Sequence, residues 1–270
     1  MENYLTIAIE KYVKYMRQRR FSQSTIKQYC GYIDKLSEID TRLYRLSNNQ
    51  IQDFILLSDS ASAQNCKINA LKLFFRLNHP EKRIKVFIRP KKDKRLIEVL
   101  TVDEVWQIID SIKHIKQKAI ITGIYLHGLR RSEILNLRYE HIDRKRNLLI
   151  IKQSKGRKDR FIPLNKDWIS YLYAYIKHED HKKGYDKPIF YPYSASSIAN
   201  ILKSKAKKAG IKKNVYPHLL RDCYATHLLL QGVDTKFIQQ ILGHSRMKTT
   251  EKYLHISAID ISKIALKKAS

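Results

Sequence analysis

The stretch from Pro80 to Arg95 most constrains the fold, because it interrupts a chain that is otherwise patterned for helices. It combines two prolines with a dense run of lysine and arginine, so we expect it to form no folded unit of its own. We therefore predict a basic linker at residues 81–95 between one domain at residues 1–80 and another at residues 96–270. With 270 residues, each domain is long enough to bury its own core.

The first domain is predicted to be a bundle of four helices, because its apolar side chains recur at helical spacing. The helices are predicted to begin near Leu5, Ser22, Ser47 and Ser62. Ser22 and Ser47 suit N-caps, and Gln50 adds capping-box spacing to Ser47. The last helix is predicted to stop at Asn78-His79-Pro80. The interspersed basic residues suit a clamp for a duplex, and the alternative is that they are solvated faces of the bundle.

Helices are also predicted for most of the second domain. Thr101 and Glu104 have capping-box spacing at the start of one helix, and a more apolar helix is predicted at residues 118–126. The C-terminal part of the domain is predicted to be helical as well. Gly210 and Gly232 are predicted helix ends, because glycine adopts the left-handed conformation that commonly follows a helix.

Two strands are predicted in the middle of this domain. Leu148-Leu149-Ile150-Ile151 and Phe161-Ile162-Pro163-Leu164 have strand character, and a polar turn at residues 154–159 joins them. The predicted fold class is therefore mainly α with a small β-sheet.

The charge of the chain indicates a polyanionic partner. Its 53 Lys plus Arg against 25 Asp plus Glu give a formal net charge of +28. Neutralising nucleic-acid phosphates releases condensed counterions, so we expect a nucleic acid, with an anionic membrane surface as the competing interpretation. No apolar run approaches the roughly 20 residues that span a bilayer, and the N-terminus lacks a signal-peptide core. We therefore expect a cytoplasmic, nucleoid-associated protein without membrane contact.

Metal and cofactor chemistry is not expected from this sequence. Cys30, Cys66 and Cys223 are far apart and lack C-x-x-C spacing, which predicts reduced core thiols. The sequence has no close acidic cluster suited to two magnesium ions and no G-x-x-x-x-G-K-[ST] motif. We therefore expect any phosphate chemistry to proceed without metal, cofactor or ATP.

Short motifs near the C-terminus predict a cationic pocket with a tyrosine delivered to it. They are His218-x-x-Arg221, then Leu242-Gly243-His244, and then Tyr253 nine residues on. Arginine and histidine supply donors, which suit an anion with several oxygens, and phosphate is the commonest such anion. Surrounding cations favour a phenolate, which suits a nucleophile. A single histidine or tyrosine is more often structural, so the hypothesis depends on the spacing.

In this order and spacing, the motifs resemble the C-terminal signature of the tyrosine recombinase (phage integrase) family. Upstream, His127-Gly128-Leu129-Arg130-Arg131-Ser132-Glu133 resembles the first arginine motif of that family. Its lysine hairpin is similar to Lys155-Gly156-Arg157-Lys158-Asp159-Arg160-Phe161-Ile162-Pro163-Leu164. The resemblance covers essentially the whole chain. It implies an N-terminal four-helix core-binding (SAM-like) domain and a mixed α/β catalytic domain, which together form a C-shaped clamp around double-stranded DNA.

The resemblance also implies catalytic roles for six residues: Arg130, Lys155, His218, Arg221, His244 and Tyr253. The arginines are implied to bind the non-bridging oxygens of a phosphodiester, where negative charge grows during attack. The histidines either donate to the same oxygens or assist proton movement, since imidazole can do both near neutral pH. Lys155 is implied to protonate the leaving 5′ oxygen, and the alternative is a lysine that only binds phosphate. Tyr253 is implied to form a 3′-phosphotyrosyl link.

Arg130 and Arg131 compete for the first arginine position. Neighbours on a helix point about 100° apart, so only one of them enters a pocket, and the family's Gly-x-Arg pattern selects Arg130. Arg131 is then a surface or DNA-backbone contact. Glu133 is predicted to hold Arg130 by a salt bridge, and a helix-surface charge is the alternative. Asp222 departs from the family, which often has a histidine directly after the second arginine.

The sequence also predicts contacts with DNA and between subunits. The predicted DNA-binding residues are Arg19, Arg20, Lys27, Lys67, Lys91, Lys92, Arg131, Arg157 and Lys158. The segment after Tyr253 carries a series of apolar side chains at Ile256, Ile259, Ile261, Ile264 and Leu266. One interpretation is that this segment packs on its own subunit. In the family this region commonly docks on a neighbouring subunit, which implies a monomer in solution that assembles on DNA as a homo-tetramer.

The resemblance implies a site-specific recombinase that exchanges strands between two duplexes, in an Xer-like or integron-integrase-like form. Its role is then Xer-like dimer resolution, or integration and excision of a mobile element. One alternative is a type IB topoisomerase-like enzyme that relaxes a single duplex. The other is a non-catalytic DNA-binding accessory protein, which would not require all six of the implied catalytic residues.

Overall fold

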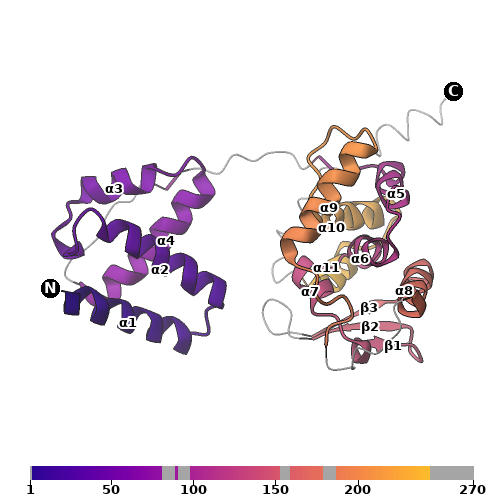
Figure 1. The fold of residues 1–270 in the computed structure, drawn as a ribbon, viewed down its shortest axis with the longest axis horizontal. Helices are drawn as coiled ribbons and strands as arrows, with labels where there is room; N and C mark the ends of the chain where they lie inside the picture. The colour runs from indigo at the N-terminus through magenta and orange to yellow at the C-terminus, as the bar shows by residue number, and fades with distance from the viewer. Residues whose placement is uncertain (1, 81–88, 91–97, 153–158, 179–186, 244–270) are drawn as a thin grey trace. The chain divides into compact units, whose positions relative to one another are not determined.

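The computed structural model describes residues 2–80, 89–90, 98–152, 159–178 and 187–243. It divides the chain into two compact units, Met1–Arg95 and Leu96–Ser270. Each unit has a hydrophobic core of its own. The described residues are mostly helical with one small sheet, so the predicted fold class is confirmed (Figure 1).

The first unit is a helical bundle. Its helices are α1 (Glu2–Gln18), α2 (Gln23–Ser37), α3 (Asn48–Leu56) and α4 (Ala61–Asn78), with a 3-10 turn, η1 (Leu43–Arg45), before α3. Ser22 caps α2 as predicted, since its hydroxyl accepts the Thr25 N–H at 3.1 Å. The capping box of Ser47 and Gln50 is also present. Two predicted starts were late: α1 begins at Glu2, and Ser60 rather than Ser62 caps α4.

The second unit surrounds its core with helices. They are α5 (Val102–Asp110), α6 (Ile115–Leu126), α7 (Arg131–Leu135), α8 (Lys166–His178), α9 (Ala195–Lys208), α10 (Pro217–Leu230) and α11 (Thr235–Leu242). The capping box of Thr101 and Glu104 begins α5 as predicted. Gly210 and Gly232 follow α9 and α10 with φ of +71° and +83°, so both predicted helix ends are confirmed.

The sheet lies between α7 and α8 in the chain and follows a 3-10 turn, η2 (Tyr139–His141). Within the described residues it has the antiparallel order β1 (Ile142–Asp143), β2 (Leu148–Ile151), β3 (Arg160–Pro163). The prediction missed β1, because two residues are too few to show an alternating pattern. It also began β3 one residue late: Arg160 belongs to the strand and is opposite Ile151.

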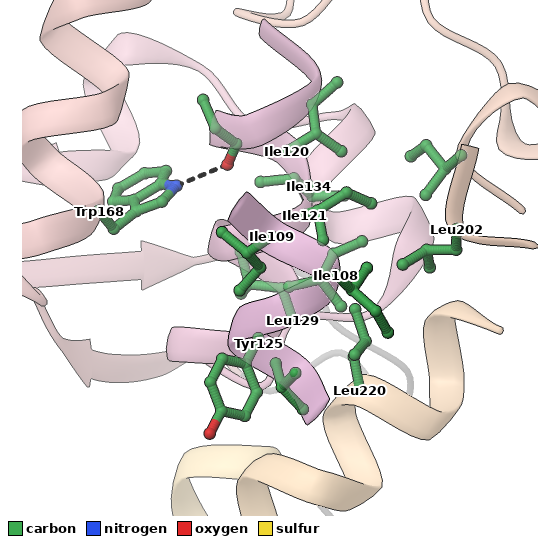
Figure 2. Packing of buried hydrophobic residues seen from close by; sticks show 14 of the residues in the cluster. Ile108, Ile109, Ile120, Ile121, Tyr125, Leu129, Ile134, Trp168, Leu202 and Leu220 are labelled. Carbon is green, nitrogen blue, oxygen red and sulfur yellow. Dashed lines mark hydrogen bonds between the residues drawn. The ribbon is translucent and has the colours of Figure 1, made fainter. Parts of the chain in front are cut away.

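Helix α6 is the centre of the second core, with buried residues on every side. Figure 2 shows apolar side chains around it and the indole N–H of Trp168 directed at a backbone carbonyl of the helix. Trp168 Nε1 donates to Ala119 O at 2.9 Å. A Cβ at Gly123 would lie 2.7 Å from Trp168 Nε1, so α8 can pack this closely only against a glycine.

The turn after α6 also depends on a glycine. Gly128 has φ of +57°, and Leu129 N donates back to Ile124 O at 3.1 Å. A Cβ at Gly128 would lie 2.5 Å from Tyr224 and 2.7 Å from Leu242. The chain therefore leaves α6 in direct contact with α10 and α11, and Arg130 follows two residues later.

Candidate active site

Arg130 lies just before a helix rather than on it. It is the N-cap of α7, with extended backbone at φ −71° and ψ 152°. Its backbone N–H donates to Glu133 Oε2 and its Nη1 to Glu133 Oε1, each at 2.7 Å. Arg131 is exposed. The prediction separated the two arginines by the 100° step of a helix, and that reason was wrong, because the change from extended to helical backbone separates them.

Arg221 lies in the first turns of α10 and is fully buried. Its Nη1 donates to Gly128 O and its Nη2 to Leu242 O. Nη1 also lies 3.9 Å from Glu133 Oε2. His218 is three residues earlier on the same side of α10, and it is exposed. Arg221 thus joins Arg130 around one carboxylate, and His218 lies towards solvent.

A third arginine, Arg160, joins this group from β3, and the sequence prediction gave it no role. Its Nη1 and Nη2 donate to Glu133 Oε1 and Oε2 at 2.8 and 2.6 Å, while its Nε donates to Ile241 O at 2.6 Å. Only 4% of its side chain is exposed. Arg130, Arg160, Arg221 and Glu133 together are called the arginine cluster from here on.

The alternation of β3 was the signal for Arg160. Arg160 and Ile162 are buried, whereas Phe161 and Pro163 are exposed. Successive side chains of a strand point to opposite faces, so an arginine two residues before a core isoleucine faces the core. Buried arginines are almost always paired, and Glu133 is the partner.

The arginine cluster carries more positive than negative charge. Burial by itself raises the pKa of the Glu133 carboxyl, but its hydrogen bonds to Arg160 and the charges of Arg160 and Arg130 outweigh burial and lower this pKa to about 2. Glu133 is therefore ionised at neutral pH, and guanidinium groups stay protonated in proteins. Three guanidinium groups and one carboxylate leave two positive charges unbalanced within the cluster.

The end of α11 partly offsets this excess. Ile241 O and Leu242 O accept from Arg160 and Arg221, and Gly243 O accepts from Arg130 Nη2 at 3.0 Å. The last carbonyls of a helix lack helical partners and form the negative end of its dipole, which carries only about half a charge. The cluster therefore still suits an anion with several oxygens.

Several predicted site residues lie outside the described residues: Lys91, Lys92, Lys155, Arg157, Lys158, His244 and Tyr253. Gly243 is the last described residue before His244. It ends α11 in the left-handed conformation, with φ of +61°.

One of the predicted DNA contacts, Lys67, is not exposed. Its side chain is buried, and Nζ donates to Phe54 O at 2.7 Å, where α3 ends with carbonyls that lack helical partners. Burial lowers the pKa of this ammonium. Lys67 is therefore a structural residue and was wrongly predicted to bind DNA. The remaining predicted contacts within the described residues are exposed: Arg19, Arg20, Lys27 and Arg131.

Two other histidines of this unit are structural. His127 is buried and its Nε2 accepts the Asn165 N–H at 3.1 Å, while burial lowers its pKa to about 4 and keeps it neutral. His227 bridges the Tyr125 hydroxyl and Leu100 O at 2.8 and 2.9 Å. Among the described residues, no group of three or more His, Cys, Asp or Glu side chains is placed to hold a metal ion. None of the helices described here is long and apolar enough to cross a bilayer.

Comparisons with known proteins support a single family. The model of the phage integrase family matches residues 98–258. A tyrosine recombinase from Thermosipho africanus is 32% identical, over 92% of this chain and 95% of that protein. Tyrosine recombinase XerA from Pyrococcus horikoshii is 30% identical, over 92% of this chain and 89% of XerA.

Solved structures give the same result for the fold. A crystal structure of XerA recombinase matches with a TM-score of 0.57 and 26% identity, over 97% of this chain and 98% of that one. A lambda integrase dimer bound to a COC′ core site matches with a TM-score of 0.73 and 20% identity, over 94% of each chain. The likeness in both cases extends over nearly the full length of the chain.

Proposed function

Because this chain belongs to the phage integrase family and is a site-specific tyrosine recombinase, we propose that it cuts and rejoins double-stranded DNA through a covalent link to Tyr253. Several structural relatives are complexes with DNA, including XerH bound to its difH substrate and the lambda integrase dimer on a core site. The net charge of +28 suits the same partner.

The arginine cluster is the observation that carries this proposal. Attack on a phosphodiester increases the negative charge on its two non-bridging oxygens, and donors fixed in advance stabilise that charge most effectively. Arg130 and Arg221 are held by Glu133 and by backbone carbonyls before any substrate arrives. They are the residues that bind the scissile phosphate, and His218 in the first turn of α10 assists them.

The remaining steps of the reaction are assigned to Tyr253, Lys155 and His244, which match the sequence motifs of the family. The Tyr253 phenol gives its proton to His218 or His244, and its oxygen attacks phosphorus while the bond from phosphorus to the 5′ oxygen breaks. Lys155 gives a proton to that leaving oxygen, and His244 donates to the phosphate. The product is a 3′-phosphotyrosyl link with a free 5′ hydroxyl, which keeps the bond energy for religation to another strand. No ATP or metal ion takes part in this scheme.

We further propose that the enzyme is Xer-like and exchanges strands between two duplexes in a homo-tetramer on DNA. The relatives reported above are recombinases, and XerA aligns over nearly its full length, which favours strand exchange over relaxation of one duplex. The apolar segment after Tyr253 is the proposed contact between subunits. Such an enzyme acts in the cytoplasm, where the chromosome lies.

A nicked suicide duplex tests the assignment. The protein is incubated with duplexes that carry candidate sites, and a covalent adduct is detected on a denaturing gel. Tyr253→Phe should abolish the adduct, because only the phenol oxygen forms the link, whereas Tyr173→Phe, an exposed tyrosine on α8, should leave it unchanged. An adduct that persists at full level in Tyr253→Phe would overturn the proposed nucleophile.

A further inference from the structure

We propose that Arg160 is a positioning residue for DNA cleavage. It fixes Arg130 and the end of α11 through contacts inside the protein and does not itself contact DNA. This inference rests on the proposed function. It adds a residue on β3 to the six implied by the family motifs, and it assigns that residue a task distinct from binding phosphate.

The donors of Arg160 point inwards. All three of its side-chain nitrogens donate to protein acceptors, namely both oxygens of Glu133 and Ile241 O, at 2.6 to 2.8 Å. With 4% of the side chain exposed, the guanidinium is covered by protein. Arg130 is the more exposed of this pair, with 21% of its side chain exposed, and the donors of Arg160 are already taken by the groups that hold Arg130 in place.

Arg160 connects three segments that are distant in the sequence. Glu133 links it to the start of α7, because Oε1 accepts from both Arg160 and Arg130 and Oε2 from Arg160 and the Arg130 backbone. Ile241 O links it to the end of α11. A Cβ at Gly243 would lie 3.1 Å from Arg160 Cδ, so the last turn of α11 rests on this side chain.

These links close a ring around Arg130. Its Nη2 donates to Leu242 O at 3.3 Å and to Gly243 O at 3.0 Å, the same helix end that Arg160 holds. Arg160 therefore fixes both supports of Arg130, the carboxylate and the helix end. The residue after Gly243 is His244, so the same contact sets where the chain leaves towards His244 and Tyr253.

Lysine cannot replace arginine here. The carboxylate of Glu133 receives two parallel N–H bonds from a planar fork, and a third donor of the same group serves a carbonyl. An ammonium keeps the charge but is a point donor and cannot match that geometry. The geometry therefore predicts that charge alone is insufficient at position 160.

The loss of DNA cleavage at low pH distinguishes a positioning role of Arg160 from a role in stability alone. The charged groups that face Glu133 are Arg130 just before α7, Arg160 from β3 and Arg221 from α10, while α11 contributes carbonyls. Without Arg160, the pKa of the buried Glu133 carboxyl rises, because burial then acts against fewer compensating bonds. Protonated Glu133 holds Arg130 less well, so an Arg160→Gln variant should lose cleavage at a higher pH than the wild type.

The test compares Arg160→Lys and Arg160→Gln with Arg146→Lys and Arg146→Gln, in which the altered side chain is exposed beyond β1. Cleavage of the suicide duplex is followed in single turnover at saturating enzyme, together with DNA affinity and melting temperature. Both Arg160 variants should bind DNA as the wild type does but cleave it about 10²-fold more slowly, the typical effect of a small misplacement of a catalytic group. Adding Glu133→Gln to Arg160→Gln should slow cleavage little further, since both changes break the same linkage.

Other results would contradict the positioning role of Arg160 or the proposed function. Wild-type cleavage rates in both Arg160 variants, or an unchanged acid limb in Arg160→Gln, would overturn the positioning role. Loss of folding and of DNA binding in both variants would show a purely structural residue and overturn it equally. A wild-type protein that forms no adduct would overturn the proposed function as well.

Discussion

The lowered pKa of Glu133 makes the free energy of unfolding of the second unit depend on pH. Substituting Glu133 alone should remove this part of the pH dependence. The pKa of this carboxyl is lowered from 4.5 to about 2. One pKa unit corresponds to about 1.4 kcal/mol, so ionised Glu133 contributes about 3 kcal/mol to the free energy of unfolding. Because the folded-state pKa is the lower one, this contribution is fully present above pH 4.5 and is lost as the pH falls towards 2.

Glu133→Gln removes both the charge and its titration. At pH 7 it should lower the free energy of unfolding by about 3–5 kcal/mol, because the buried Arg160 and Arg221 and the partly exposed Arg130 lose their counter-charge. The gap between wild type and variant should shrink by about 3 kcal/mol between pH 5 and pH 2. Urea unfolding followed by tryptophan fluorescence measures this gap in the second unit alone, since both tryptophans, Trp106 and Trp168, lie there.

An exposed carboxylate provides the control. Glu140 pairs with Lys152 at 3.4 Å, and 61% of its side chain is exposed. Because exposed pairs contribute little, Glu140→Gln should leave the free energy of unfolding within about 1 kcal/mol of the wild type across this pH range. A gap between wild type and Glu133→Gln that stays constant from pH 5 to pH 2 would refute the account of the arginine cluster.

Three further predictions test the turn after α6, the buried lysine and a helix cap. Gly128→Ala should destabilise the second unit by about 2–4 kcal/mol in urea unfolding, because alanine is strained at positive φ and its Cβ would collide with neighbouring side chains. Lys67→Met should leave the salt dependence of DNA binding unchanged, whereas Lys27→Gln should reduce the slope of log K against log salt by about 0.9 if this exposed lysine contacts a phosphate. Ser47→Ala should lower the stability of the first unit by about 1 kcal/mol in circular dichroism melts, and Ser24→Ala should change it much less, because Ser47 caps α3 whereas Ser24 is not a helix cap.

The sequence predicted best what depends on neighbouring residues. The caps at Ser22, Ser47 and Thr101 and the glycine helix ends were correct, because a cap needs only a side chain and a backbone group three residues away. The errors of a residue or two at α4 and β3 arose because several adjacent residues suited the same end.

The features that could not be predicted from the sequence depend on tertiary contacts. Lys67 has the spacing of an exposed basic residue, and only the packing of α4 against α3 shows that its ammonium caps a helix end. Arg160 is linked to Glu133 and Ile241, which are 27 and 81 residues away. No local pattern encodes such contacts. The alternation of β3 could still have shown that Arg160 faces the core.

The ends of secondary-structure elements explain why arginine recurs in this site. Arg130 precedes α7, Arg221 lies near the start of α10, and α11 ends against both. The carbonyls at such a helix end need donors, and the phosphate proposed as substrate needs donors as well. A guanidinium offers five N–H groups in one plane, enough to serve a carbonyl, Glu133 and an anion together, whereas an ammonium has three and no fixed plane. The groups proposed to bind the phosphate are therefore the groups that hold the helix ends in place, so the site forms only when these ends have packed together.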